Sequence, residues 1–141
     1  MTNGDKADSA KEAELGVRII ATDYKDVAVL VNILENNNVH TVISALVMTP
    51  DAGGPLEPNL IRAADASKTT RRMIASDFGF PQYKEWVPTL IRKLQYHSLF
   101  DRDGDIIPSI PMKQASLEAL EATTDLEWTR FHVGCFMDYF A

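Results

Sequence analysis

The sequence predicts an α/β fold with a mainly parallel sheet, and two observations lead to that prediction. Short apolar runs alternate with segments whose apolar residues recur at helical spacing, which is the pattern of strand–helix–strand units. The clearest run, residues 39–47, is almost continuously apolar, as is typical of a strand inside a parallel sheet. The chain has 141 residues, of which 45% are hydrophobic, so it can bury the core of one domain.

The first third of the chain is predicted to form a helix, a strand and a second helix. The short first helix, residues 8–14, is closed by Gly16, because glycine readily adopts the left-handed conformation that ends many helices. Residues 17–21 are mostly apolar and β-branched, which favours a strand. Residues 27–36 carry apolar side chains at helical spacing, and the run of asparagines after them ends that helix.

The same alternation continues to the end of the chain. The strand at residues 39–47 stops in a segment rich in Pro and Gly. Residues 59–67, rich in Ala, Leu and Ile, are predicted to be a helix, and residues 71–75 a strand. An apolar side predicts a helix at residues 111–122, and aromatic and β-branched residues predict a last strand at residues 127–133.

Residues 80–110 are rich in Pro, aromatic and charged residues and have weak periodicity. They are predicted to be a long irregular insertion with one helix near residues 88–96. Within this insertion, the alternating carboxylates of residues 101–105 resemble the start of an EF-hand loop. However, Gly104 stands at the fourth position rather than the sixth, and Met112 stands where the loop needs Glu. The three histidines show no ligand spacing either, so no metal site is predicted.

Composition excludes several classes of function. The net charge is −6 and the basic residues are scattered, so the chain lacks the basic stripe that nucleic-acid binding needs. Cys135 is the single cysteine, so no internal disulfide can form. No apolar run approaches the roughly 20 residues that span a bilayer. Residues 1–10 do not resemble a signal peptide, and we expect a cytoplasmic protein whose partners are small molecules or other proteins.

Polar residues follow three of the predicted strands at the point where each strand ends. The segments are Thr22-Asp23-Tyr24, Ser44-Ala45-Leu46 and Ser76-Asp77-Phe78-Gly79. Ligands of open α/β sheets bind outside the carboxyl ends of the strands. Taken singly, each segment is what any turn after a buried strand contains, but together they predict a ligand site at one edge of the sheet.

Four segments also resemble, in order and spacing, the NmrA-like and isoflavone-reductase-like branch of the short-chain dehydrogenases. Residues 17–26 are similar to the third strand of that family and its Gly-Asp turn, with Thr22 in the place of the glycine. Residues 42–46 resemble the fourth strand, and residues 72–79 the fifth strand with its Pro-Ser-Glu-Phe-Gly end, from which Ala75 and Asp77 depart. The last segment, Asp125 to Phe140, resembles the leucine, aromatic, threonine and Gly-Cys-Phe run that closes the family's nucleotide-binding half.

The resemblance implies a partial Rossmann-like three-layer fold that lacks its first βαβ unit, and NADP(H) as the cofactor of the parent family. It also implies that Lys113, on the helix before the last strand, lies near the nicotinamide and acts as or supports the general base. A solvated helix lysine is the alternative for Lys113. The residues expected along the cofactor are Ser44, Ala45, Ser76 and Phe78, with Asp23 near the adenine.

Two motifs of related enzymes are missing from the sequence. The glycines never form the Gly-rich phosphate turn of a dinucleotide-binding fold, so tight NADP(H) binding by this chain alone is not expected. No Tyr-x-x-x-Lys pair is present, which excludes the phenolate mechanism of ordinary short-chain dehydrogenases. We therefore interpret residues 1–141 as one partial nucleotide-binding domain, from a truncated gene model, a degenerate paralogue or a fragment.

The missing first strands also lead to an expectation about pairing. We expect a sheet of at least four strands in which residues 17–21 move in to pair with residues 42–46. The alternative is a detached strand with an exposed apolar edge.

Two functions from different classes remain open. The first is an NADP(H)-dependent reductase of small substrates, including aromatic ones, in which Lys113 assists proton transfer. The second is an NmrA-like regulator that senses the dinucleotide, binds protein partners and catalyses nothing. A third reading is that this chain has no activity by itself.

Overall fold

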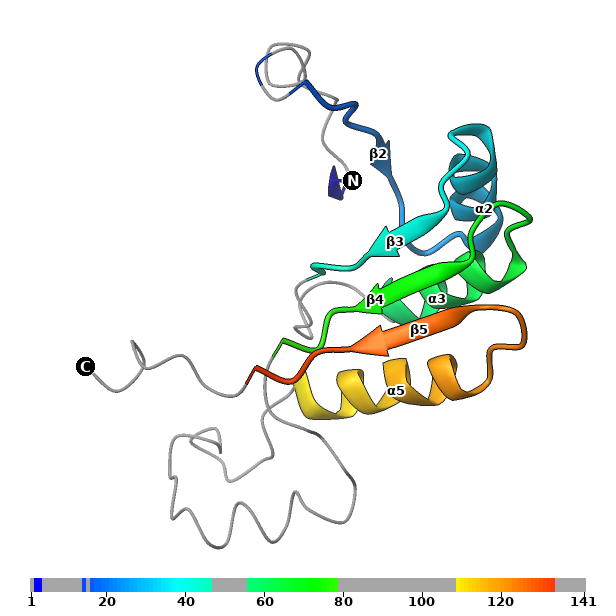
Figure 1. The fold of residues 1–141 in the computed structure, drawn as a ribbon. Coiled ribbons are helices and arrows are strands. Elements are labelled where there is room, and N and C mark those ends of the chain that lie inside the picture. Colours follow the sequence, from blue (N-terminus) through cyan, green and yellow to red (C-terminus); the bar gives the residue numbers. More distant parts are fainter. Residues whose placement is uncertain (1, 4–13, 15, 47–55, 79–108, 134–141) are drawn as a thin grey trace, which may run out of the picture.

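The computed structural model describes residues 2–3, 14, 16–46, 56–78 and 109–133. Within them the strands and helices alternate along the chain (Figure 1). The strands are β1 (Thr2–Asn3), β2 (Ala21–Thr22), β3 (Thr41–Ile43), β4 (Arg72–Ala75) and β5 (Glu127–Arg130), and the helices are α2 (Val27–Asn36), α3 (Leu56–Ala66) and α5 (Ser109–Glu121). No helix in these ranges is long and apolar enough to cross a bilayer.

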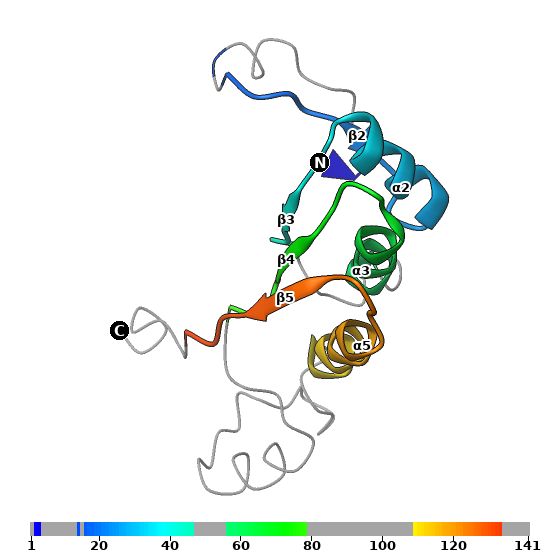
Figure 2. The same cartoon turned by 45° about the vertical axis from the view of Figure 1, so that its right-hand side comes forward.

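The main sheet has three parallel strands in the order β3-β4-β5, which confirms the predicted parallel α/β fold. β4 is the central strand, and its Met73 lies between Val42 of β3 and Trp128 of β5. Figure 2 shows α2, α3 and α5 side by side on one face of this sheet. Side chains alternate between the two faces, so Met73 and Ala75 point to the helices and are buried, whereas Ile43 on the other face is 66% exposed.

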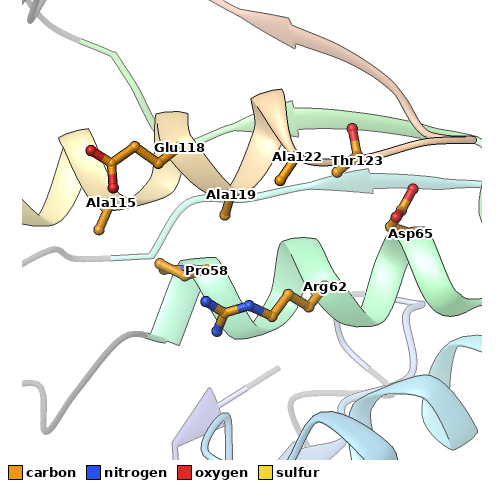
Figure 3. A pocket seen from close by; sticks show the side chains of 8 residues that line it. All are labelled: Pro58, Arg62, Asp65, Ala115, Glu118, Ala119, Ala122 and Thr123. Atoms are coloured by element: carbon orange, nitrogen blue, oxygen red, sulfur yellow. The ribbon is translucent and has the colours of Figure 1, made fainter.

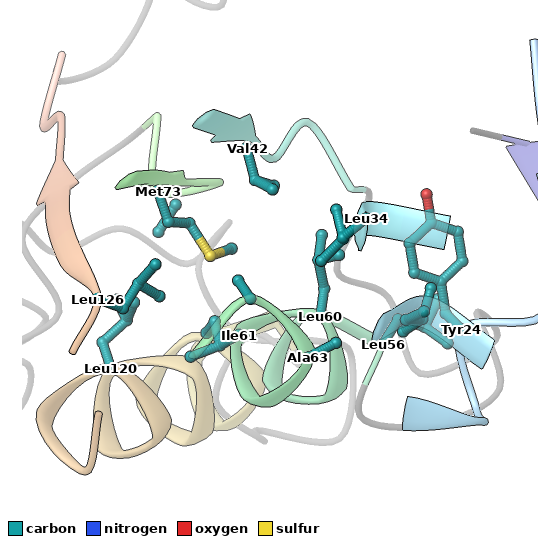
Figure 4. Packing of buried hydrophobic residues seen from close by; sticks show 13 residues of the cluster. Tyr24, Leu34, Val42, Leu56, Leu60, Ile61, Ala63, Met73, Leu120 and Leu126 are labelled. Atoms are coloured by element: carbon teal, nitrogen blue, oxygen red, sulfur yellow. The ribbon is translucent and has the colours of Figure 1, made fainter. Parts of the chain in front are cut away.

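The core lies between the sheet and this layer of helices. Leu30 of α2, Ile61 of α3 and Leu120 of α5 are almost fully buried and belong to the same apolar cluster as Met73 of the sheet. Figure 4 shows Ile61 and Leu120 on their helices below Met73. The helical spacing seen in the sequence gives each helix one apolar face, and burial of that face supplies most of the stabilisation.

The ends of α2 are set by side chains and backbone geometry that its sequence provides. Asp26 caps the helix, because its carboxylate accepts hydrogen bonds from the backbone N–H groups of Ala28 and Val29. Asn38 takes a positive φ of 49° just after the helix, a conformation that Asn tolerates better than most residues. The predicted range, residues 27–36, is therefore confirmed.

Other boundaries differ from the sequence prediction. α3 begins at Leu56 rather than at residue 59, because Pro58 is tolerated in the first turn, where its missing N–H is not needed. β3 covers only Thr41–Ile43 of the predicted strand at residues 39–47, of which residue 47 is outside the described ranges. β5 ends at Arg130 rather than at residue 133, and α5 begins at Ser109 rather than at residue 111.

Several predictions fall on residues that are not described. These are most of the first helix, the insertion at residues 80–110 with its helix at 88–96, and the run from Gly134 to Phe140 with Cys135. Of the first helix, Glu14 is helical and Gly16 has a φ of 64°, in agreement with its predicted position after the helix end.

The expected four-stranded sheet is wrong, because β2 does not pair with β3. β2 is reduced to Ala21–Thr22 and pairs in parallel with β1 instead. A groove of about 300 Å³ lies between Arg18 and Ile20 on one side and β3 on the other. The detached arrangement therefore holds, and it leaves apolar side chains exposed on both segments, with Val17 at 54% and Ile43 at 66%.

Two neighbouring residues of α2 provide a test of this core. Leu30→Ala should lower the free energy of unfolding by about 2–5 kcal/mol, because Leu30 is 0% exposed and its loss leaves a cavity. Val29→Ala should change it by less than about 0.5 kcal/mol, because Val29 is 42% exposed. Urea unfolding followed by circular dichroism measures both values, and equal losses would contradict the placement of the core.

Candidate functional site

The carboxyl ends of β3, β4 and β5 meet at one edge of the parallel sheet. Ser44 follows β3, Asp77 lies two residues beyond β4, and Arg130 is the last residue of β5. The first half of α5 lies beside this edge (Figure 1), and its Lys113 pairs with Asp77 there. Of the three strand ends predicted to converge, those after β3 and β4 meet here, whereas the segment Thr22-Asp23-Tyr24 follows β2, which belongs to a separate sheet. The end of β5 takes the third place at this edge.

Asp77 is the centre of this edge. Its side chain is 4% exposed, and three basic side chains surround it. Lys113 Nζ lies 3.4 Å from Oδ1, while Arg130 Nη2 pairs closely with Oδ2 and His132 Nδ1 lies 3.4 Å from the same oxygen. Such pairing is what permits the burial of a carboxylate, which otherwise costs several kcal/mol.

The strand register explains why these groups meet. Ala75 of β4 stands opposite Arg130 of β5, so the residues two positions later, Asp77 and His132, continue on the same face. That face is the one covered by helices, so α5 can place Lys113 against Asp77. Arg72 and Glu127 form an ion pair on the opposite, uncovered face at 2.8 Å, with both side chains largely exposed.

The cluster as a whole was not predicted from the sequence. Asp77 was placed in a strand-end segment and noted as a departure from the family motif, and Arg130 was given no role. The spacing of the basic residues could have predicted the cluster, because Arg130 and His132 are two residues apart in an extended segment and therefore share a face. The first acidic residue after the neighbouring parallel strand then becomes their natural partner.

The first turn of α3 fixes the backbone of two of these segments. Glu57 is 2% exposed, and its Oε1 accepts a hydrogen bond of 2.6 Å from the Ser76 N–H. Ser76 Oγ in turn donates to the Leu46 carbonyl at 3.0 Å, which joins the ends of β4 and β3. The side-chain amide of Asn59 donates to the Tyr24 carbonyl at 3.0 Å. This single helix turn therefore contacts the segments after β2 and β4.

Tyr24 itself is not available as a base. Its ring packs in the core at 4% exposure, and burial raises the pKa of its hydroxyl because desolvation disfavours the phenolate. Tyr24 therefore stays protonated at neutral pH. The basic side chains that the described residues place at the strand-end edge are Lys113, Arg130 and His132.

The residues expected along the cofactor lie at the strand ends, but they differ in accessibility. Ser44 is buried at 2%, and its backbone N–H donates to the Ile74 carbonyl at 2.8 Å. Its hydroxyl has no hydrogen-bond partner within the described ranges, and neither has that of Thr22. Ala45 is exposed, and the Phe78 ring is 42% exposed. Buried hydroxyls without partners are uncommon and are candidates for contact with a ligand.

Asp23 is the one predicted residue that stands apart from the three-stranded sheet. It follows the detached β2, is exposed, and accepts a hydrogen bond from the Lys25 N–H at 2.9 Å. Within the described residues, no hydrogen bond or ion pair joins it to Lys113 or Asp77. The structure thus brings Lys113, Ser76 and Phe78 to the edge where Ser44 and Ala45 follow β3, and leaves Asp23 outside that group.

A second hollow lies in the helix layer, away from the sheet. It is a groove of about 320 Å³ between α3 and α5 (Figure 3). Two alanines of α5, and a third directly after its end, face a mixed surface of α3 across it. The lining residues are Pro58, Arg62, Asp65, Ala115, Glu118, Ala119, Ala122 and Thr123. None of them belongs to the strand-end site.

Comparisons by sequence find curated oxidoreductases. No family model matches the chain. The chain is 32% identical over 127 residues to Oxidoreductase BOA1 of Botryotinia fuckeliana (strain B05.10), a match that covers 90% of this chain and 36% of that protein. It is 34% identical over 124 residues to Oxidoreductase swnN of Metarhizium robertsii (strain ARSEF 23 / ATCC MYA-3075), covering 84% of this chain and 36% of that protein. The chain thus spans about a third of the length of these relatives.

Comparisons by structure find the same fold in solved reductases. AtPrR2 with NADP+ and (+)pinoresinol is similar with a TM-score of 0.63 at 18% identity, covering 93% of this chain and 37% of that one. The leucoanthocyanidin reductase of Vitis vinifera with NADPH gives a TM-score of 0.60 at 15% identity, covering 87% and 36%. The pinoresinol-lariciresinol and phenylcoumaran benzylic ether reductases give 0.64 at 20% identity, covering 92% and 36%.

The fold is Rossmann-like, as in these solved reductases. The predicted resemblance to isoflavone-reductase-like proteins is confirmed as a similarity, because curated oxidoreductases match in sequence and pinoresinol-lariciresinol and phenylcoumaran benzylic ether reductases match in fold. Two of the similar structures hold NADP+ or NADPH, in agreement with NADP(H) as the cofactor expected for the parent family.

The link between Glu57 and Ser76 can be tested by hydrogen exchange. Glu57→Gln keeps the shape of the side chain but removes its charge, so a charge-assisted hydrogen bond becomes a neutral one that is weaker by about 1 kcal/mol. We expect the Ser76 amide to exchange with solvent about fivefold faster.

The matched control lies at the other end of α3. Asp65 accepts hydrogen bonds from the backbone N–H groups of Thr124 and Asp125, so Asp65→Asn should speed exchange there and leave Ser76 unchanged. An unchanged Ser76 rate in Glu57→Gln would show that Glu57 does not hold this segment.

Proposed function

We propose that this chain forms the reacting end of the NADP(H) site in an isoflavone-reductase-like reductase of small substrates, including aromatic ones. The observation that carries the proposal is the position of Lys113. A helix and a buried carboxylate hold its ammonium group at the carboxyl ends of parallel strands, where ligands of such sheets bind. The similarity to curated oxidoreductases supports a redox reaction.

The residues at this edge suit the reacting half of the cofactor. The exposed Phe78 ring offers an apolar surface for a flat ring, and the buried Ser44 hydroxyl is a hydrogen-bonding group without a partner in the described part of the chain. Ala45 and Ser76 complete the surface on the two adjacent strands. Asp23 remains assigned to the adenine end. NADPH, when bound, supplies the hydride.

Lys113 would handle the proton of this reaction. Reduction of a small substrate consumes a proton as well as a hydride, and a general acid or base near the cofactor accelerates such transfers by about 10²–10⁴. Lys113 is 16% exposed, so its Nζ is shielded from bulk water but still reachable from the strand-end edge.

The second candidate is a dinucleotide-binding regulator without catalysis. One observation favours it: Lys113 is already engaged by the buried carboxylate of Asp77, and a lysine held as an ammonium ion in a structural pair does not accept a proton. The same edge would then serve only to bind the dinucleotide and to present a surface to a protein partner. This reading includes the case in which the chain alone is inactive.

A lysine replacement in a longer relative separates the two candidates. In a longer relative that carries lysines at the positions aligned with Lys113 and Lys68, replacing the first of them by Met should lower the turnover of NADPH in a substrate screen by about 10²–10⁴. The affinity for NADPH should change little, because the proposed role is in proton transfer. A Met replacement equivalent to the exposed Lys68 serves as the control. Unchanged turnover in the first variant would favour the regulator.

The chain by itself should bind NADPH weakly. The pyrophosphate is the most charged part of the ligand, and the sequence provides no Gly-rich turn to hold it. Losing three or four charge-assisted hydrogen bonds, each worth roughly 1.5–3 kcal/mol, weakens binding by several orders of magnitude. A fluorescence titration with NADPH measures this affinity. A dissociation constant in the low micromolar range would show that other residues of this chain bind the phosphates.

A further inference from the structure

Asp77 has two oxygens that face different cations. Oδ1 faces Lys113 on α5, and Oδ2 faces Arg130 and His132 on the segment that begins with β5. The carboxylate thus links α5 to the segment that begins with β5. Lys113 and Arg130 are coupled through the charge that they share.

Arg130 and Lys113 interact unequally with the negative charge of Asp77. Arg130 is 9% exposed and in close contact with Oδ2, whereas Lys113 is 16% exposed and 3.4 Å from Oδ1. A guanidinium is always charged and pairs well with carboxylates, so Arg130 is the main counter-ion. Lys113 is therefore held in place by a carboxylate whose charge is already largely balanced.

We propose that Asp77 and Arg130 are positioning residues for Lys113: Asp77 holds its Nζ at the strand ends, and Arg130 balances Asp77 so that Lys113 remains able to release its proton. This inference rests on the proposed role of Lys113 in proton transfer. It removes the objection that an ion-paired lysine is inert, because the partner of Lys113 is shared with a stronger cation.

If Asp77 and Arg130 have these roles, removing them changes the reactivity of the Lys113 amine in opposite directions. Without the Asp77 charge, Lys113 faces Arg130 with no carboxylate between them, which disfavours the ammonium ion and raises the reactivity of the amine. Without Arg130, the charge of Asp77 is shared only between His132 and Lys113 among these three cations, so it acts more strongly on Lys113, which stabilises the ammonium ion and lowers that reactivity. A purely structural cluster would instead loosen in both variants and raise the reactivity in both.

Competitive labelling of amines on the full 141-residue chain tests this difference. The chain is treated with trace acetic anhydride at one fixed pH, and the label on each lysine is counted by mass spectrometry, with the exposed Lys25 and Lys68 as internal references. Asp77→Asn should raise the relative labelling of Lys113 by about tenfold, and Arg130→Gln should lower it by about threefold or more.

Charge-conserving variants and a matched ion pair are the controls. Asp77→Glu and Arg130→Lys keep the charges and should remain within about twofold of the original chain. Arg72→Gln removes the ion pair that joins the same two strands on the other face of the sheet, and should leave Lys113 unchanged.

The outcomes decide between the readings. A rise in Asp77→Asn with a fall in Arg130→Gln supports the proposal, and any other pair of results overturns it. If the Asp77→Asn variant does not unfold cooperatively, the Arg130 variants decide alone. Lower labelling of Lys113 in Arg130→Gln, with no decrease in Arg130→Lys, supports the proposal. Any other result for these two variants overturns it. Labelling does not depend on turnover, so the two proposals fail separately. The turnover test can contradict the reductase proposal while the labelling supports the positioning role, and the labelling can contradict the positioning role while the enzyme turns over NADPH.

Discussion

The parallel pairing of β4 with strands on both sides is the constraint on which the rest of this structure depends. It aligns β3, β4 and β5 so that all three carboxyl ends reach the same edge. It also sets which side chains share a face, so that Val42, Met73 and Ala75 bury against the helices. The site is a consequence of the same register, because Asp77 and His132 continue the face on which Ala75 and Arg130 are neighbours.

Buried polar groups then fix the ends of the strands more firmly than the short ladders do. β3 and β4 contribute only Thr41–Ile43 and Arg72–Ala75 to the sheet, yet the chain beyond β4 is held by Glu57, by the Leu46 carbonyl and by the ion pairs of Asp77. Each such group is costly to bury alone and stabilising when paired. The polar side chains at this edge therefore serve the fold and pre-organise the site together.

Local sequence patterns predicted the helices and strands well. The contacts between segments distant in the sequence were predicted poorly. Asp26 and the asparagines around Asn38 mark α2 in the sequence because capping and stopping are local effects. The predicted pairing of β2 was wrong, because strands pair through backbone hydrogen bonds, and the side chains of one strand do not specify which strand it pairs with. Lys113 could be selected only through a family resemblance, and Arg130 was missed because its role exists only beside Asp77.

The structure finally separates two requirements that a dinucleotide site usually combines. Affinity for NADP(H) comes largely from fixed donors to the phosphates, and these depend on a Gly-rich turn that this sequence does not contain. In the proposed function, the chemistry would depend on a proton-transfer group and on the surface beside the reacting ring, and both would come from α5 and from the ends of β3, β4 and β5. The ion pairs of Asp77 hold Lys113 of α5 and Arg130 of β5 in place through residues of this chain itself. Under that proposal, geometry for catalysis and strength of binding are separate properties, and this chain would carry the first.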